Sequence, residues 1–276
     1  MIERTIVITG ASDGIGAAAA RALGAGGDRV VVVGRSSDKT RAVAKQVGAD
    51  FYLADFSRLA EVRNLAATLL EQYPSIDVLA NNAGGIMGER ALTEDGHEQT
   101  FQVNHLAPFL LTTLLMDRLV ESRARVINTS SAANRIFSKF AIDDLDAEQK
   151  YSPNRAYGNA KLANILFTKE LHHRYHAAGI NTAAFHPGIV ATSFSAGSTS
   201  LLRHLYEGLA SRVMLTPEAG ADTLVWLASS RPGEDWQSGE YYSKRKPAQA
   251  SSQVDDAGLA AELWERSAQM VAPVVR

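Results

Sequence analysis

The chain has 276 residues, of which 46% are hydrophobic and 21% charged, and its formal net charge is −2. This length can supply a large core within one α/β domain, and the near-neutral charge argues against a nucleic-acid-binding surface. The sequence contains no cysteine, which excludes disulfides, thiolate chemistry and cysteine-ligated metal sites. No apolar run approaches the roughly 20 residues of a membrane span, and strand-like residues begin almost at once. We therefore expect no membrane span, signal peptide or anchor, and a cytoplasmic location.

Short β-branched runs alternate with longer helical patterns along the chain. The predicted strands are residues 4–9, 29–34, 50–53, 76–80, 124–129, 181–186 and 240–242. This alternation predicts an α/β fold, a Rossmann-type doubly wound parallel sheet of about seven strands with helices on both faces. We expect a single domain over residues 1–276, which ends in an amphipathic helix at 255–271.

The first predicted strand leads into the glycine-rich turn Gly10-Ala-Ser-Asp-Gly-Ile-Gly16 and then into a helix. Glycines allow the backbone to turn sharply and to approach a pyrophosphate, whose charge the N-terminus of the following helix would favour. The spacing is G-x-x-x-G-x-G, which differs from the G-x-G-x-x-G of other dinucleotide-binding folds. An ordinary tight turn is the alternative, but the strand-then-helix context favours a phosphate-binding turn.

Tyr157 and Lys161 are four residues apart in a stretch with a helical pattern. Positions i and i+4 share a helix face, so the phenol and the ammonium would point into the same space. An adjacent ammonium stabilises phenolate and lowers a phenol pKa that is ordinarily about 10. Tyr157 is therefore a candidate general acid/base, and a solvated surface pair is the alternative.

Further motifs follow in order along the chain. Asn81-Asn-Ala-Gly84 follows the apolar run at 76–80, and Asn104, the Ser130-Ser131 pair and Pro187-Gly188 come later. Together with the glycine turn and the tyrosine–lysine pair, these motifs resemble the short-chain dehydrogenase/reductase family over about residues 4–247. A closer likeness to the retinol dehydrogenase and WW-domain oxidoreductase branch is carried by Tyr157-Gly-Asn-Ala-Lys-Leu-Ala-Asn-Ile-Leu-Phe167, His186-Pro-Gly188, Thr216-Pro-Glu-Ala-Gly-Ala221 and Ser238-Gly-Glu-Tyr-Tyr242.

The resemblance implies four catalytic residues. Tyr157 would exchange a proton with a carbonyl or alcohol oxygen, and Ser131, the second serine of the pair, would polarise the same oxygen. Lys161 would bond the nicotinamide ribose and lower the Tyr157 pKa, and Asn104 would hold a water that links Lys161 to solvent. On the local sequence alone, Asn104 could instead be an amide that kinks a helix before Pro108.

The resemblance also implies a nicotinamide cofactor. Arg35 ends the second strand where NAD-preferring relatives place an acid, and its guanidinium suits a 2′-phosphate, so we predict NADP(H) rather than NAD(H). Asp13 would oppose that phosphate if it faced it, and Arg35 could also be a solvated loop residue. The implied cofactor-binding residues are Gly10, Ser12, Asp13, Gly14, Ile15, Gly16, Arg35, Asp55, Phe56, Asn82, Ala83, Gly84, Tyr157, Lys161, Pro187, Gly188, Val190 and Thr192. Among them, Asp55 and Phe56 would border the adenine, and relatives more often have a branched aliphatic residue in place of Phe56.

Two segments, near 133–153 and 193–215, correspond to those that cover the substrate in this family. Both carry apolar side chains, which indicates a small hydrophobic carbonyl or alcohol substrate, unless these side chains only pack the lids onto the body. Because all four catalytic positions are filled, we expect an enzyme, and a non-catalytic NADP(H)-sensing or scaffold protein is the alternative.

Assembly and metal binding are less strongly indicated. In the family, helices equivalent to 106–120 and 155–177 often form homodimer or homotetramer interfaces, and the apolar run 109–116 needs cover. Burial within one subunit explains that run equally well. His172, His173 and His176 lie near the polar end of a long helix, and we expect no metal site there.

Overall fold

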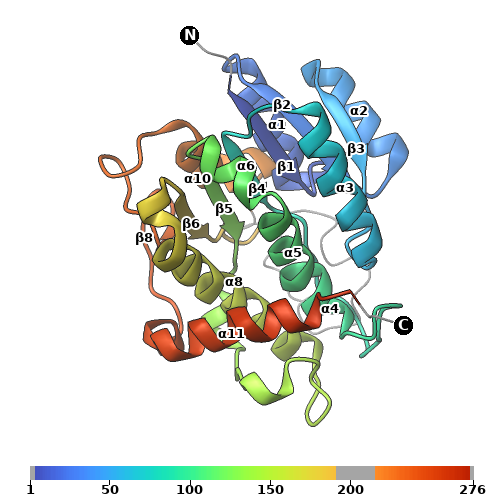
Figure 1. The fold of residues 1–276 in the computed structure, drawn as a ribbon, viewed down its shortest axis with the longest axis vertical. Helices are drawn as coiled ribbons and strands as arrows, with labels where there is room; N and C mark the ends of the chain where they lie inside the picture. Colours follow the sequence, from blue (N-terminus) through green and yellow to red (C-terminus); the bar gives the residue numbers. More distant parts are fainter. Residues whose placement is uncertain (1–3, 191–214, 274–276) are drawn as a thin grey trace.

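The computed structural model describes residues 4–190 and 215–273 of the chain. Its strands form one sheet in the order β3-β2-β1-β4-β5-β6-β7-β8 (Figure 1). All neighbouring strands pair in parallel except β7 and β8, which are antiparallel. The strands are β1 (Thr5–Thr9), β2 (Arg29–Gly34), β3 (Asp50–Leu53), β4 (Val78–Asn81), β5 (Arg125–Thr129), β6 (Asn181–Phe185), β7 (Glu240–Ser243) and β8 (Lys246–Pro247).

This arrangement confirms the predicted doubly wound sheet, with β8 as an added edge strand. Lys244 and Arg245 have φ values of +50° and +59° and join β7 to β8. Two consecutive residues with positive φ match the twist of a tight hairpin. Lys246, which follows this exposed turn, starts the added strand.

Helices cover both faces of the sheet (Figure 1). One face carries α1 (Gly14–Ala25), α2 (Ser37–Val47) and α10 (Pro217–Ser229). The other carries α3 (Leu59–Gln72), α5 (Ala107–Leu114) and α8 (Pro153–Tyr175), with α11 (Ala257–Met270) packed outside α8. The shorter helices are α4 (Gln99–Phe101), α6 (Met116–Glu121) and α7 (Ala133–Ile136). Because both faces are covered, the central strands are largely buried, and all five residues of β1 are buried.

An aromatic cluster joins α5, α8 and α11. The Trp264 ring centroid lies 5.0 Å from that of Phe109 and 5.7 Å from that of Phe167. The Arg174 guanidinium lies 4.7 Å above the Trp264 ring, which adds a cation–π contact. Most of the apolar run 109–116 is therefore buried by helices of the same chain, so its hydrophobicity is no evidence for a subunit interface.

His105 is buried within this helical layer. Its Nε2 lies 2.9 Å from Ser267 Oγ, and its Nδ1 lies 3.3 Å from Asn164 Oδ1. Phe101, Phe109 and Phe167 rings surround the imidazole. Burial lowers the His105 pKa to about 4, so the native protein holds a neutral imidazole at neutral pH.

We predict that this histidine makes the fold acid-sensitive. The unfolded chain takes up the proton near pH 6.5 and the native protein near pH 4, so stability falls as the pH decreases between these values. The total loss of unfolding free energy from this proton is about 3 kcal/mol, at about 1.4 kcal/mol per pKa unit. Urea unfolding at several pH values should show this loss in the wild-type protein and a smaller loss in His105→Gln. The exposed control His173→Gln should keep the wild-type pH dependence. If the free energy of unfolding of His105→Gln fell with pH as steeply as that of the wild-type protein, the assignment would be contradicted.

Candidate active site

The glycine turn after β1 lies against the segment after β4. Gly10 has a φ of +64°, and a Cβ built on it would lie 2.7 Å from Ala83 Cα. A Cβ on Gly16 would overlap the Gly10 carbonyl oxygen. Only glycine fits these positions, so the turn brings bare backbone to the N-terminus of α1 at the carboxyl edge of the sheet. This is the geometry that a dinucleotide pyrophosphate needs.

Asp13 in this turn has two charged or polar partners that the sequence did not reveal. One carboxylate oxygen accepts a hydrogen bond from Gly14 N at 2.8 Å, which caps α1. The other lies 2.7 Å from Lys39 Nζ on α2. Gly34, directly before Arg35, packs against Ser12 in the same turn: a Cβ on Gly34 would lie 2.8 Å from Ser12 Cβ. Arg35 and Lys39 thus give this end of the site two cations beside one acid.

Asp55 and Phe56 follow β3. The Asp55 carboxylate accepts hydrogen bonds from Ser57 N at 3.0 Å and Ser57 Oγ at 2.8 Å, so it caps its own turn. Phe56 is buried and belongs to the core on the α3 side of the sheet. Its larger ring is therefore accommodated by the core.

The segment after β4 joins three strand ends. Asn82 Nδ2 donates to Thr9 O at 3.1 Å, and Asn82 Oδ1 accepts from Thr129 Oγ1 at 3.3 Å. Gly84 is the point of closest approach to the predicted catalytic residues. A Cβ there would overlap Asn104 Oδ1 and lie 3.2 Å from Lys161 Nζ.

The two serines after β5 have different environments. Ser130 is 1% exposed, and its hydroxyl donates to Lys161 O at 2.7 Å. Ser131 is partly exposed, and its hydroxyl accepts a hydrogen bond from Ala133 N at 3.2 Å. Its proton is not used in that bond. The geometry therefore independently favours Ser131 over Ser130 as the serine that could bond a substrate oxygen.

Tyr157 and Lys161 lie on the first turns of α8, which begins at the Ser152 cap. The Lys161 ammonium lies 5.5 Å from the Tyr157 ring centroid and donates to Thr129 O at 3.1 Å. Lys161 is 1% exposed, and burial lowers its pKa to about 7. The pair is therefore buried within the protein, which excludes the alternative of a solvated surface pair.

Asn104 lies in a π-helical turn, Gln102–Leu106, immediately before α5. Its Nδ2 donates to Gly85 O at 2.9 Å and Thr100 O at 2.8 Å, and its Oδ1 accepts from Gly85 N at 3.1 Å. Asn104 is thus part of a distorted helical turn, as the local sequence allowed, and it also lies against Gly84 beside Lys161. Wide turns of this kind are often found at functional sites.

The segment after β6 completes the described edge. Gly188 has a φ of +85°, and Val190 pairs with Leu215 in an isolated bridge. A Cβ on Gly220 of α10 would lie 2.6 Å from Val190 Cγ2 and 3.2 Å from Ile15 Cγ1. Val190 therefore lies close to Ile15 of the glycine turn, and Pro187 and Gly188 precede it in the same segment. Thr192, and the predicted lid at 193–215 except its last residue, fall outside the described residues.

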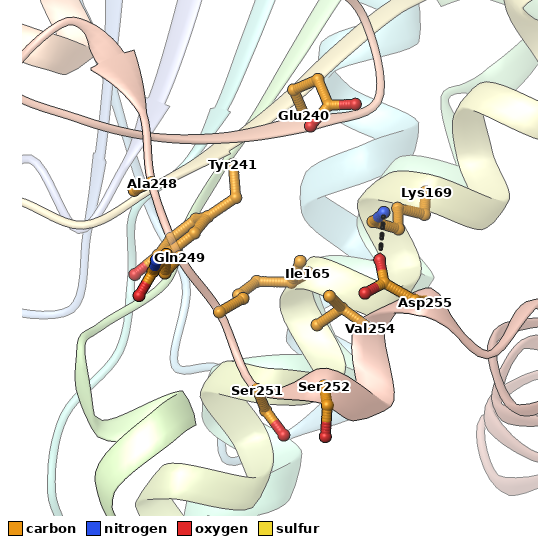
Figure 2. Close-up of a pocket in the computed structure, with 11 residues that line it drawn as sticks. Ile165, Lys169, Glu240, Tyr241, Ala248, Gln249, Ser251, Ser252, Val254 and Asp255 are labelled. Atoms are coloured by element: carbon orange, nitrogen blue, oxygen red, sulfur yellow. Dashed lines mark hydrogen bonds and ion pairs between the residues drawn. The ribbon is translucent and has the colours of Figure 1, made fainter.

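Other candidate sites are less developed. A cavity of 290 Å³ lies between α8, β7 and the segment 248–255, and the Lys169–Asp255 ion pair is on its wall (Figure 2). It contains none of the predicted catalytic residues.

Among the described residues, no group of three or more histidine, aspartate or glutamate side chains could hold a metal ion. Within residues 4–190 and 215–273, no helix has both the length and the apolarity to cross a membrane.

Comparison with known proteins places this site in a family. A family model described as short chain dehydrogenase matches residues 4–201. The chain is 42% identical to a proposed daunorubicin C-13 ketoreductase from Streptomyces sp. (strain C5), over 99% of this chain and 94% of that protein. It is 37% identical to human retinol dehydrogenase 12, over 97% of this chain and 86% of the relative.

Solved structures show the same fold. A crystal structure of an uncharacterised protein from Mycobacterium paratuberculosis matches with a TM-score of 0.78 and 34% identity, covering 97% of this chain and 93% of that one. The RhlG/NADP complex from Pseudomonas aeruginosa matches with a TM-score of 0.68 and 26% identity, covering 86% and 93%. The chain belongs to the short-chain dehydrogenase/reductase family. Within it, the chain is a member of the retinol dehydrogenase-like branch.

We predict that burial of the Lys161 ammonium lowers the stability of the fold. Its native pKa of about 7 lies below the ordinary 10.5, so the unfolded chain binds more protons between these values. Burial therefore destabilises the fold most at or below pH 7, and the cost fades as the pH rises towards 10.5. In cofactor-free protein, Lys161→Met should raise the free energy of unfolding by a few kcal/mol at pH 7 and by less at pH 9. The control Lys169→Met, two turns along α8 at the surface, should change it little. A loss of stability in Lys161→Met would contradict this account.

Proposed function

We propose that the chain is an NADP(H)-dependent oxidoreductase that interconverts the carbonyl and alcohol of a hydrophobic small molecule, with Tyr157 as general acid/base. The observation that carries the proposal is the burial of Lys161 beside Tyr157, against Gly84 and Asn104. A lysine ammonium is costly to bury, and few structural purposes require one at the carboxyl edge of a parallel sheet. Membership of an oxidoreductase family supports the same reaction class.

The proposed chemistry follows from the side chains. NADPH would supply the hydride. Tyr157 would donate its phenolic proton to the carbonyl oxygen, and the ammonium of Lys161 would stabilise the phenolate that remains. The free proton of the Ser131 hydroxyl would bond the same oxygen as negative charge develops there. Asn104 would place a water beside Lys161 through the carbonyls of its wide turn, and that water would return the proton from solvent.

Each part of a dinucleotide would have its own set of residues in this site. The glycine turn and the N-terminus of α1 would bind the pyrophosphate. Asn82, Ala83 and Gly84 would line the adenosine side, and Lys161 would bond the nicotinamide ribose. Asp55 would bond the adenine amino group while capping its own turn. The segment from Pro187 to Val190, together with Thr192, would hold the carboxamide.

Charge at the adenosine end supports NADP(H) over NAD(H). Arg35 follows β2 where a 2′-phosphate would lie, and no acid replaces it. Asp13, the residue that opposed this preference, is paired with Lys39 at 2.7 Å, which offsets its charge. Some structural neighbours are NADP complexes, RhlG among them.

Apolar side chains surround the proposed acid. Ile86, Ala133 and Tyr157 form a buried cluster with Phe137 packed against it, and Ile136 nearby is 64% exposed. An apolar wall of this kind suits a bulky aromatic or polycyclic ketone or aldehyde more than a small polar one. The name of the daunorubicin C-13 ketoreductase relative refers to reduction of a ketone. The homo-oligomeric state and the cytoplasmic location remain predictions.

A sensing or scaffold role on the same fold is the second candidate. It would need cofactor binding without a competent acid. All four catalytic positions are filled and three of them are buried, which favours an enzyme.

The test of the proposed function is turnover with a single phenol removed. NADPH consumption should be followed with a panel of aromatic, polycyclic, retinoid-like and aliphatic aldehydes and ketones. Tyr157→Phe should lower kcat by about 1000-fold, since general acid catalysis contributes roughly 100- to 10,000-fold, and should leave the Kd of NADPH nearly unchanged. Tyr151→Phe is a matched control, because its hydroxyl donates to Gly88 O at 2.8 Å outside the catalytic group. Tight NADPH binding with no turnover on any carbonyl would favour the sensing role.

The cofactor preference has its own test. Arg35→Ala should weaken NADPH binding by about tenfold or more and leave NADH binding nearly unchanged, since a charge-assisted bond to phosphate is worth roughly 1.5–3 kcal/mol. Lys39→Ala should also weaken NADPH binding, because it leaves the charge of Asp13 uncompensated, and Asp13→Asn in that background should restore part of the loss. Arg41→Ala, an exposed cation on the same helix, is the control. Tighter binding of NADH than NADPH by the wild-type protein would contradict the assignment.

A further inference from the structure

Asn134 lies one helical turn after Ser131 and is completely buried. Neither its residue type nor its position marked it as functional in the sequence. Its side chain is nevertheless the centre of a polar network. Nδ2 donates to Ser131 O at 2.6 Å and to the Tyr241 hydroxyl at 3.1 Å, and Oδ1 accepts from Ser251 N at 2.9 Å.

These bonds join parts of the chain that are far apart in sequence. Ser251 is 117 residues from Asn134, in the segment that follows β8, and Tyr241 is on β7. Figure 2 shows Tyr241 and Ser251 on the wall of the cavity beside α8. The turn that carries Ser131 is therefore bonded, through Asn134, to β7 and to the segment that follows β8.

The network extends towards the backbone of Lys161. The Tyr241 hydroxyl lies near the Ser130 side chain, and the Ser130 hydroxyl donates to Lys161 O at 2.7 Å. The side chains of Asn134, Tyr241 and Ser130 thus lie between the backbone carbonyls of Ser131 and Lys161. Bonds of this kind in a dry interior polarise one another and fix the groups that they join.

We propose that Asn134, supported by Tyr241, is a positioning residue that fixes the Ser131 hydroxyl relative to Tyr157 and Lys161. The inference rests on the proposed function, in which Ser131 bonds the reacting oxygen. Ser131 Oγ is oriented by a bond from Ala133 N, within the same short turn whose carbonyl Asn134 holds. Without the Asn134 amide, that carbonyl and the Ser251 N–H lose their side-chain partner, and the turn can relax. A displacement of about 1 Å at a reacting group can cost about 100-fold in rate.

A double-mutant cycle tests this directly. Asn134→Ala should lower kcat by about 10- to 100-fold while the Kd of NADPH stays nearly unchanged, because the residue acts only through Ser131. In a Ser131→Ala background, Asn134→Ala should change kcat by less than about twofold, because there is no hydroxyl left to position. Independent losses that multiply in the double variant would overturn the inference.

Two further variants separate positioning from folding. Asn128→Ala removes a similarly buried asparagine on β5, whose amide bonds Asn81 and Thr168 and no catalytic residue among those the structure describes, so it should lower the Tm without a comparable loss of kcat. Tyr241→Phe deletes a single hydroxyl and serves if Asn134→Ala does not fold. It should lower kcat about three- to tenfold, and only when Ser131 is present.

These measurements distinguish failure of the proposed function from failure of the positioning role of Asn134. No turnover by the wild-type protein, or no effect of Ser131→Ala, would overturn the proposed function and this inference with it. Turnover that depends on Ser131, combined with multiplicative losses for both Asn134→Ala and Tyr241→Phe, would overturn the inference alone.

Discussion

The site depends on one unfavourable placement, a lysine ammonium held out of water. Lys161 lies on α8, in contact with the end of β5, and its ammonium donates a hydrogen bond to the Thr129 carbonyl. Desolvation lowers its pKa to about 7 and costs stability, and the large apolar core on both sides of the sheet sustains that cost. In return, a cation lies beside a phenol and against Gly84, at the place where a dinucleotide would lie. With a pKa of about 7, Lys161 is partly charged at neutral pH before any ligand binds.

The scaffold fixes this charge through the ends of neighbouring strands. Asn82 joins β1 and β5, and the bare backbone at Gly10 and Gly84 allows close approach that any side chain would block. Behind the site, Asn134 and Ser130 bond the backbone on which Ser131 and Lys161 are carried. Sites built on rigid elements in this way keep reacting groups within the small tolerance that catalysis requires.

Much of the fold could be predicted because its signals are local. The β-branched runs located seven strands, and the i,i+4 spacing placed Tyr157 and Lys161 on one helix face. β8 was missed because a two-residue strand has no periodicity, and its pairing with β7 across the turn at Lys244 and Arg245 appears only in the fold. The apolar run 109–116 remained ambiguous, because part of its cover comes from Phe167 and Trp264, which are far along the chain.

The candidate site shows the same division between local and long-range information. The glycines could be located by motif, because the backbone at Gly10, Gly16 and Gly84 leaves no room for a side chain. Ser131 and Asn104 were proposed through the family resemblance. The pairing of Asp13 with Lys39 could not be predicted, because it depends on how α2 packs against the glycine turn. This pairing offsets the negative charge that argued against a 2′-phosphate beside Arg35. Asn134 could not be predicted for the same reason. Its partners Tyr241 and Ser251 are distant in sequence and lie beside it only in the folded protein.

We propose that this geometry delivers a hydride from NADPH to a carbonyl carbon and a proton from Tyr157 to the carbonyl oxygen. The most direct test is a single-turnover reaction with NADPH deuterated at C4 and the best ketone of the panel, followed by mass spectrometry of the alcohol. The account predicts one deuterium on the carbinol carbon when the transferred face carries the label, and none when the opposite face does. Bound NADPH that never delivers deuterium to any carbonyl would contradict it.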